Sequence, residues 1–130
     1  MVGLLVVAHA GLARELLAAA EMIVGPIEKS EAVGIASDDT VEQIRDNVQS
    51  AIDNVAGDGV IIMTDMFGGT PSNMSISFLK EDEIEVLTGV NLPMVIKFAS
   101  ERERFGFAEL ASVLKKSGQE SISVAGEYLK

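Results

Sequence analysis

The sequence predicts an α/β protein built around a mostly parallel sheet. Apolar runs of strand length alternate with segments of helical period along the whole chain, which is the pattern of repeated strand–helix units. The run at 59–64, GVIIMT, is apolar on both faces, as expected of a central parallel strand covered by helices on two sides. We expect a single domain over residues 1–130, because a chain of this size buries about two thirds of its unfolded surface and contains no Pro- or Ser-rich linker.

The first unit is predicted to be a strand over Val2–Ala8 followed by a helix that begins near Gly11. Gly25-Pro26 ends this helix, because proline lacks an amide N–H and fixes φ. A short second strand is predicted over Val33–Ala36. Spacing of three to four residues predicts the buried face of the helix as Leu12, Leu16, Ala20 and Ile23.

The second helix carries the clearest boundary signals. Thr40 and Gln43 have the spacing of a capping box, apolar residues recur every three to four positions from Val41 to Val55, and Gly57 is a suitable stop. The apolar strand at 59–64 follows, and Asp65 stands at its carboxyl end.

In the second half, Thr70-Pro71 is a cap-and-proline pair that predicts a helix reaching about Leu79. Ile84–Thr88 is predicted as a more exposed fourth strand, because acidic residues alternate with apolar ones there. Further helices are predicted from Asn91-Leu92-Pro93 and over Phe107–Lys116, with Ser100–Arg104 as a solvated loop or helix end between them. The alternation in Ser121–Val124 predicts a short final strand.

Composition excludes several classes of function. The net charge of −10 argues against binding to nucleic acid or to an anionic membrane surface. The chain has no cysteine and one histidine, so we expect no disulfide, no thiolate metal site and no zinc centre. Apolar runs stay far below the ~20 residues of a membrane span, and the N-terminus lacks a secretory signal pattern, so we expect a cytoplasmic protein without membrane insertion.

The one histidine, His9, stands where the first strand gives way to the first helix. If strands one and three are neighbours, His9 and Asp65 lie side by side at the crevice where open α/β sheets bind ligands. A carboxylate that accepts a hydrogen bond from Nδ1–H leaves the Nε2 lone pair free to attack. The alternative is a structural histidine, with Asp65 an unrelated loop or cap residue.

The segment 67–73, FGGTPSN, has the features of an anion-binding turn. Gly68 and Gly69 allow close approach of the backbone, the start of a helix offers free N–H groups, and Thr70 and Ser72 add hydroxyls. The alternative is a tight turn before a well-capped helix.

The chain lacks both a GxGxxG motif and a Walker A lysine motif, which leaves dinucleotide and NTP binding with little support. Asp65 could also resemble the phospho-acceptor of a receiver domain, but His9-Ala10 replaces the acidic pair that would hold magnesium.

In order and spacing, these motifs resemble the IIA domain of the mannose family of the bacterial phosphoenolpyruvate-dependent sugar phosphotransferase system. The resemblance implies a three-layer α/β/α fold with a four-stranded parallel sheet in the order 2-1-3-4. It also implies a homodimer that exchanges a C-terminal antiparallel strand, for which Ser121–Val124 is the candidate here. The matching pieces are the strand ending in His9, Leu12-Ala13, Ala20-Glu21-Met22 with Gly25, TDMFGGTPSN at 64–73 and GVNLPM at 89–94.

The resemblance further implies a phosphotransferase that needs no bound cofactor. His9 would accept a phosphoryl group from the phosphocarrier protein HPr and pass it to a IIB component, expected on a separate polypeptide because the chain ends at Lys130. Asp65 would orient the imidazole, while the backbone of Gly68–Ser72 and the hydroxyls of Thr70 and Ser72 would receive the phosphoryl oxygens.

The chain departs from the family at Ala10, where the family commonly has glycine. Two other functions stay open at this point, a regulatory phosphohistidine module and a subunit serving dihydroxyacetone kinase. The sequence does not indicate a sugar.

Overall fold

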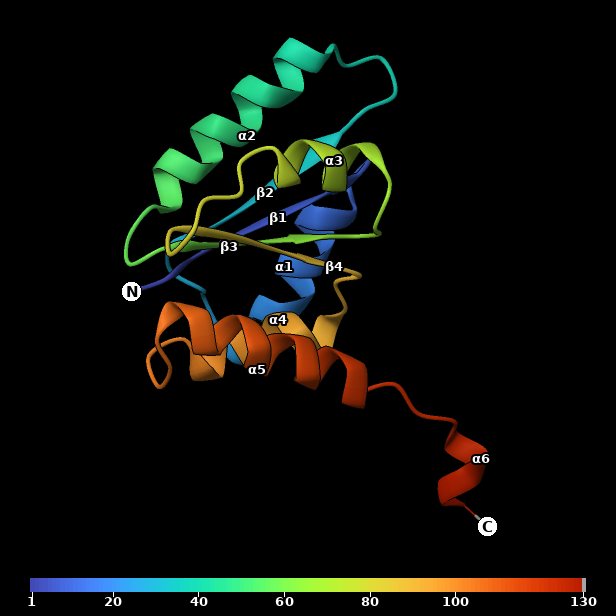
Figure 1. Cartoon of the computed structure of the whole chain (residues 1–130). Coiled ribbons are helices and arrows are strands. Elements are labelled where there is room, and N and C mark those ends of the chain that lie inside the picture. The colour runs from blue at the N-terminus through green and yellow to red at the C-terminus, as the bar shows by residue number, and fades with distance from the viewer. Residues whose placement is uncertain (130) are drawn as a thin grey trace.

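Four parallel strands form the centre of the molecule. The computed structural model describes residues 1–129, and its strands are β1 (Gly3–His9), β2 (Ser30–Ile35), β3 (Val60–Thr64) and β4 (Ile84–Thr88). They are hydrogen-bonded in the order β2-β1-β3-β4, and every pairing is parallel (Figure 1). The predicted sheet order is therefore confirmed.

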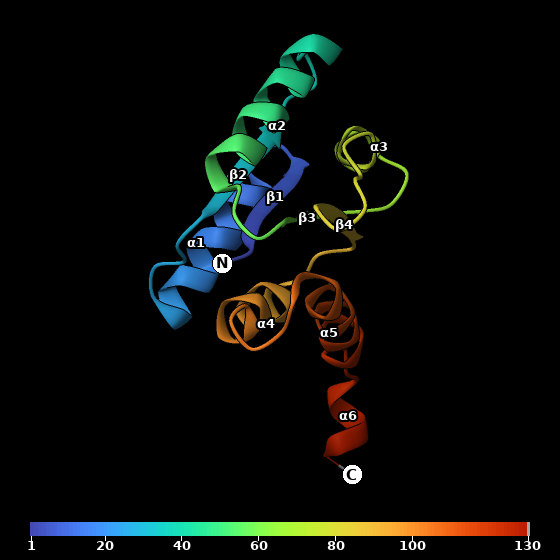
Figure 2. The ribbon, with the colours of Figure 1, turned by 60° about the vertical axis from the view of Figure 1, so that its left-hand side comes forward.

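Helices cover both faces of the sheet and make the predicted three layers. α1 (Leu12–Val24), α4 (Leu92–Glu101) and α5 (Phe107–Glu120) lie on one face, while α2 (Val41–Val55) and α3 (Thr70–Ile76) lie on the other (Figures 1 and 2). The short helix α6 (Ala125–Tyr128) projects away from this body beyond the end of α5.

Alternation along β1 decides which layer each side chain enters, because successive strand residues point to opposite faces. Leu4, Val6 and Ala8 belong to the core beneath α1, α4 and α5. Leu5 and Val7 belong to the core beneath α2. His9 continues the second series, so its side chain leaves the sheet on the face that also carries α3.

The helix boundaries agree with the sequence better than the helix faces do. The capping box of α2 is present, with Gln43 N–H donating to Thr40 Oγ1 at 3.1 Å and Thr40 N–H donating to Gln43 Oε1 at 2.8 Å. The buried face predicted for α1 was half right: Ala20 is buried and Leu16 packs against the core, but Leu12 and Ile23 are exposed. Its buried residues form a neighbouring stripe that includes two small side chains, which let the helix pack closely on the sheet: Ala13, Leu17 and Ala20.

Two further predictions need correction in the second half. α3 is shorter than predicted and begins from Gly69 rather than from a Thr70 cap. The stretch 100–104 contains the predicted helix end, since α4 runs to Glu101, but it is not solvated throughout, because Arg102 is buried. The caps of α4 are as predicted, with Asn91 Oδ1 accepting from Met94 N–H at 3.0 Å.

The predicted strand at Ser121–Val124 is absent from the described residues. Ser121 ends α5, residues 122–124 lie outside any strand, and α6 follows. A strand requires a neighbouring strand edge to pair with, and in the single chain this segment projects away from the sheet (Figure 1). Between residues 1 and 129, no helix is both long enough and apolar enough to cross a membrane.

Candidate functional site

His9 and Asp65 meet at the carboxyl edge of the sheet, because their strands are direct neighbours. The register pairs Val7 with Thr64, so each chain continues past that pair into the same crevice. His9 Nδ1 lies 2.7 Å from Asp65 Oδ2, and the backbone N–H of His9 donates to the same oxygen at 3.0 Å. One carboxylate oxygen thus holds both the ring and the backbone of the histidine.

The protonation state of Asp65 fixes the tautomer of the neutral ring. Burial raises the pKa of Asp65, but hydrogen bonds from His9 N–H, the His9 ring and Met66 N–H outweigh burial and hold that pKa below its ordinary value. An ionised carboxylate accepts hydrogen bonds and cannot donate them, so Nδ1 must carry the proton. In the neutral imidazole the lone pair then resides on Nε2.

The ring combines a fixed orientation with access to solvent. The His9 side chain is 50% exposed, whereas the Asp65 side chain is 12% exposed. The α-carbon of Gly69 lies against the ring, since a Cβ built there would stand 3.1 Å from Cε1 and 3.6 Å from Nε2. A glycine at 69 therefore keeps the Nε2 side of the ring open.

A buried chain of hydroxyls anchors the loop that carries Asp65. Ser72 Oγ donates to the carbonyl oxygen of Met66 at 2.6 Å and lies 2.6 Å from Thr64 Oγ1. Because a hydroxyl has one proton to donate, Thr64 must donate to Ser72. The expectation that the Ser72 hydroxyl receives a phosphoryl oxygen does not fit this arrangement, since Ser72 is fully buried and its hydroxyl is already bonded on both sides.

Gly68 and Thr70 are exposed on the same loop, beside Gly69. Gly68 has a φ of +91°, a conformation that glycine adopts without a steric penalty. Gly69 is thus the loop residue that lies against the ring, Thr70 next to it is exposed, and Ser72 is buried in the core. Sequence reasoning missed Thr64 as an anchor, although a threonine at the end of an otherwise apolar strand was the available signal.

The turn after His9 has an unusual backbone. Ala10 has a φ of +53°, a region that residues with a Cβ rarely adopt. Its N–H donates to the carbonyl oxygen of Ile35 in β2 at 2.9 Å, which extends the β1–β2 pairing past the histidine. The sequence did not signal this conformation, because an alanine seldom adopts a positive φ.

Other charged groups take no part in the pair. Arg14 is 83% exposed in its side chain and lies 3.7 Å from Glu15, its nearest ionic partner, as expected of a solvated helix face. Within residues 1–129, no cluster of three or more His, Asp or Glu side chains is arranged to hold a metal ion. The site is thus a carboxylate–imidazole pair beside a glycine-rich loop, and fold and site together define an α/β protein with an oriented, solvent-accessible histidine.

Comparison with known proteins agrees with the class that the fold and site define. The family model described as EIIA-man, PTS system fructose IIA component, matches residues 3–115. The chain is 28% identical over 132 residues to the fructose-specific EIIA component of Bacillus subtilis, covering 100% of this chain and 90% of that protein. It is 30% identical over 118 residues to the sorbose-specific EIIA component of Lacticaseibacillus casei, covering 90% and 86%.

The fold also matches a solved structure. A phosphotransferase system component EIIA from Streptococcus agalactiae superposes with a TM-score of 0.89 at 24% identity, over 98% of this chain and 99% of that one. The chain belongs to the mannose family of EIIA components of the sugar phosphotransferase system.

Proposed function

We propose that this protein is a phosphocarrier in which Nε2 of His9 accepts a phosphoryl group from HPr and passes it to a IIB component. The observation that carries the proposal is the 2.7 Å contact between His9 Nδ1 and Asp65 Oδ2, which turns the opposite nitrogen of a half-exposed ring outward as the nucleophile. Membership of the EIIA family supports the same chemistry.

Each transfer exchanges one bond to phosphorus for another. The Nε2 lone pair attacks the phosphorus of phosphorylated HPr, the new N–P bond forms as the old bond breaks, and its electron pair returns to HPr. The second step repeats this exchange from His9 to the IIB component. The Nδ1 proton stays in its hydrogen bond with Asp65 throughout, and the carboxylate stabilises the positive charge that develops on the attacking ring.

The exposed part of the glycine-rich loop is our candidate for receiving the phosphoryl oxygens. Gly69 lies against the ring, and the Thr70 hydroxyl and the backbone N–H groups of Gly68 and Gly69 are the neighbouring donors. Ser72 can contribute only its backbone to binding the phosphoryl oxygens, because its hydroxyl is hydrogen-bonded to Thr64 and to the Met66 carbonyl oxygen.

The proposal makes the protein a transferase that is its own covalent intermediate, with no bound cofactor. It places the chain in the cytoplasm, where phosphoenolpyruvate is available to start the relay. Selection of the sugar belongs to the components that follow in the relay.

The test is reconstitution of the relay with labelled phosphoenolpyruvate, enzyme I and HPr. We expect label on the chain that survives base and is lost in acid, as for phosphohistidine, and transfer of that label to a IIB protein. Label removed by hydroxylamine would point instead to an aspartyl phosphate. Folded protein without label, in the presence of active donors, would overturn the proposal. Label that passes to no IIB protein, while a kinase or regulator co-purifies with the chain, would favour the regulatory alternative.

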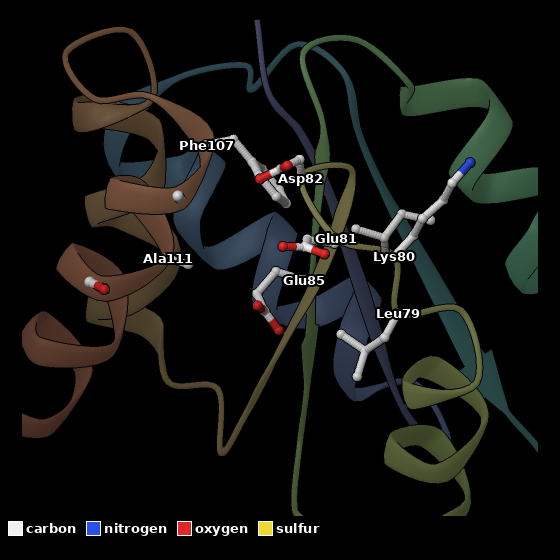
Figure 3. A pocket seen from close by; sticks show the side chains of 10 residues that line it. Leu79, Lys80, Glu81, Asp82, Glu85, Phe107 and Ala111 are labelled. Atoms are coloured by element: carbon white, nitrogen blue, oxygen red, sulfur yellow. The ribbon is translucent and has the colours of Figure 1, made fainter.

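We also propose that the protein is a homodimer in which the C-terminal segment of each chain pairs with β4 of the other. Within residues 1–129, β3 is the one strand paired with β4; on its second edge Ile84 forms an isolated bridge with Lys80, and from Glu85 to Thr88 that edge has no strand beside it. A hollow of about 480 Å³ lies between this edge and α5, lined by Leu79, Glu85, Phe107 and Ala111 among others (Figure 3).

The C-terminal segment has the apolar character that this edge needs. Four large apolar side chains of the segment are exposed in the single chain: Ile122, Val124, Tyr128 and Leu129. Alternation places Ile122 and Val124 on the same face of an extended strand. The association is testable by analytical ultracentrifugation. We expect Val124→Asp to convert a dimer to a monomer and Ser123→Asp, on the opposite face, to leave the dimer; a wild-type monomer would contradict the pairing.

A further inference from the structure

Gly34 in β2 lies directly under the turn that follows His9. In the register of the sheet, Gly34 stands opposite Ala8, and the chain beyond His9 passes back over it. A Cβ built on Gly34 would lie 2.3 Å from the carbonyl oxygen of Ala10 and 3.4 Å from its carbonyl carbon. Both contacts are with backbone, so no side-chain rotation could relieve them.

A hydrogen bond to β2 also holds the same turn in place. Ala10 keeps a φ of +53° while its N–H donates to Ile35 O, the residue next to Gly34. A strained φ at a residue with a Cβ persists only where the surrounding structure imposes it. Here β2 provides both constraints: the Ile35 carbonyl oxygen accepts the hydrogen bond from Ala10 N–H, and the α-carbon of Gly34, which has no side chain, lies close to the Ala10 carbonyl.

The constraint reaches the ring because His9 is the residue before Ala10. His9 N–H and Nδ1 both bond to one oxygen, Asp65 Oδ2, at 3.0 and 2.7 Å. A shift of the Ala10 peptide group therefore rotates the backbone that carries the ring and lengthens a bond to Asp65. A glycine inside a strand is also unfavourable by itself, which calls for a reason such as this close approach.

We infer that Gly34 is a positioning residue for His9: its missing side chain admits the Ala10 carbonyl and so sets the angle at which the imidazole faces Asp65. The consequence for transfer rests on the proposed function, whereas the consequence for ring geometry does not. A misplacement of about 1 Å in a reacting group can cost a hundredfold in rate.

Three alanine variants of the full chain separate this role from general damage. Gly34→Ala introduces the clash beneath the turn. Gly57→Ala introduces a clash of the same size at the far end of the sheet, where its Cβ would lie 2.2 Å from Met1 O. Gly11→Ala adds a Cβ within the turn itself at a position with open space. The readouts are the ¹⁵N chemical shifts of the His9 ring and the rate of labelling by phosphorylated HPr.

We expect Gly34→Ala to move the ring nitrogen shifts and to slow labelling by roughly tenfold to a hundredfold. Gly11→Ala and Gly57→Ala should keep the wild-type shifts and rate, even where Gly57→Ala lowers the melting temperature. Wild-type ring shifts in folded Gly34→Ala would overturn the inference. Failure of wild-type labelling would count against the proposed function alone, because the ring shifts need no donor protein.

If Gly34→Ala does not fold, the double variant Ala10→Gly/Gly34→Ala replaces it, because glycine at position 10 can turn its carbonyl away from residue 34. The inference then predicts a folded protein with displaced ring shifts relative to Ala10→Gly alone. Identical shifts in these two variants would overturn it.

Discussion

At the carboxyl ends of the strands, the imidazole of His9 is half exposed beside Asp65, whereas at the amino ends Arg102 is 93% buried, with 7% of its surface exposed. The Arg102 guanidinium donates to the carbonyl oxygen of Glu28 at 2.6 Å and to that of Val2. It also lies over the ring of Phe98, 4.7 Å from the centroid. Arg102 thus links the residues that precede β1 and β2 to the C-terminal end of α4.

The two ends show how the choice of partner decides what a polar side chain does. At the amino end, backbone carbonyls accept from the guanidinium, which has no lone pair to offer a reagent. At the carboxyl end, the carboxylate accepts from one nitrogen of the ring and leaves the other nitrogen with its lone pair toward solvent. We therefore assign stability to the first end and chemistry to the second, and the following changes test that division.

Replacement of the nucleophile has the largest expected effect. His9→Gln should reduce labelling by phosphorylated HPr below detection, because the chain has no second histidine to take over as acceptor. The unfolding free energy should fall by about 0.5–1.5 kcal/mol, the usual contribution of one hydrogen bond, since the variant loses the contact between the half-exposed ring and Asp65. Labelling at the wild-type rate would show that another residue is the acceptor.

Arg102→Met tests the opposite end. Removal of the guanidinium leaves the buried carbonyl of Val2 and the partly buried carbonyl of Glu28 without their donor, which should cost about 2–4 kcal/mol of unfolding free energy. The labelling rate of the folded variant should stay within about twofold of wild type, because the two ends share no contact. Urea denaturation and the labelling assay together check this. A large loss of rate without loss of stability would contradict the division.

Asp65→Asn preserves shape but removes the anionic acceptor. The amide can donate to Nδ1 and so favour the tautomer whose lone pair points inward, as a triad Asp→Asn change does. Labelling should slow by at least about a hundredfold, and the ring ¹⁵N shifts should report the exchanged tautomer. An unchanged tautomer with slow transfer would instead assign Asp65 to charge stabilisation alone.

Asp65 also predicts a pH dependence of stability. Its pKa is lower in the folded protein than in the unfolded chain, so its contribution is complete above the unfolded value and is lost as pH falls through the folded value. The difference in unfolding free energy between wild type and Asp65→Asn should therefore shrink as the pH falls below about 4. Asp58, which pairs with the N-terminal amine of Met1, also has a lowered pKa. Subtraction of the two curves removes its contribution, and a difference that grows on acidification would contradict the assignment.

The smallest effects separate the two glycines of the loop. Gly69→Ala is compatible with the backbone, whose φ is −91°, but brings a Cβ to 3.1 Å from His9 Cε1. It should slow labelling several-fold, up to roughly tenfold, with little loss of stability. Gly68→Ala meets open space at a φ of +91°, so it should cost about 1 kcal/mol of stability with a smaller effect on rate. The reverse pattern would show that Gly69 does not face the reacting nitrogen.

Much of this architecture follows from the sequence, because strand-end geometry is a local rule. An apolar strand ending in His9 and another ending before Asp65 predicted that the two side chains meet if these strands are neighbours, and the sheet order implied by the family resemblance met that condition. The capping box at Thr40 likewise depends on residues three apart. These predictions succeed because the deciding contacts are either short-range or imposed by the order of the sheet.

The failures concern orientation in three dimensions. In α1, two overlapping stripes satisfy the helical period, and only packing against the sheet selects the one with Ala13 and Ala20. Ser72 looked like an anion ligand in the sequence, but its position in the first turn of α3 points its hydroxyl toward Thr64. The burial of Arg102 depends on carbonyl groups 74 and 100 residues away, which no local pattern can indicate.

The most direct test of the central claim is to locate the phosphoryl group on the protein by ³¹P and ¹⁵N NMR of the labelled chain. Because Asp65 occupies Nδ1, the account predicts a phosphorus–nitrogen coupling at Nε2 of His9 and a retained proton on Nδ1. A phosphoryl group on Nδ1, or on the carboxylate of Asp65, would contradict it.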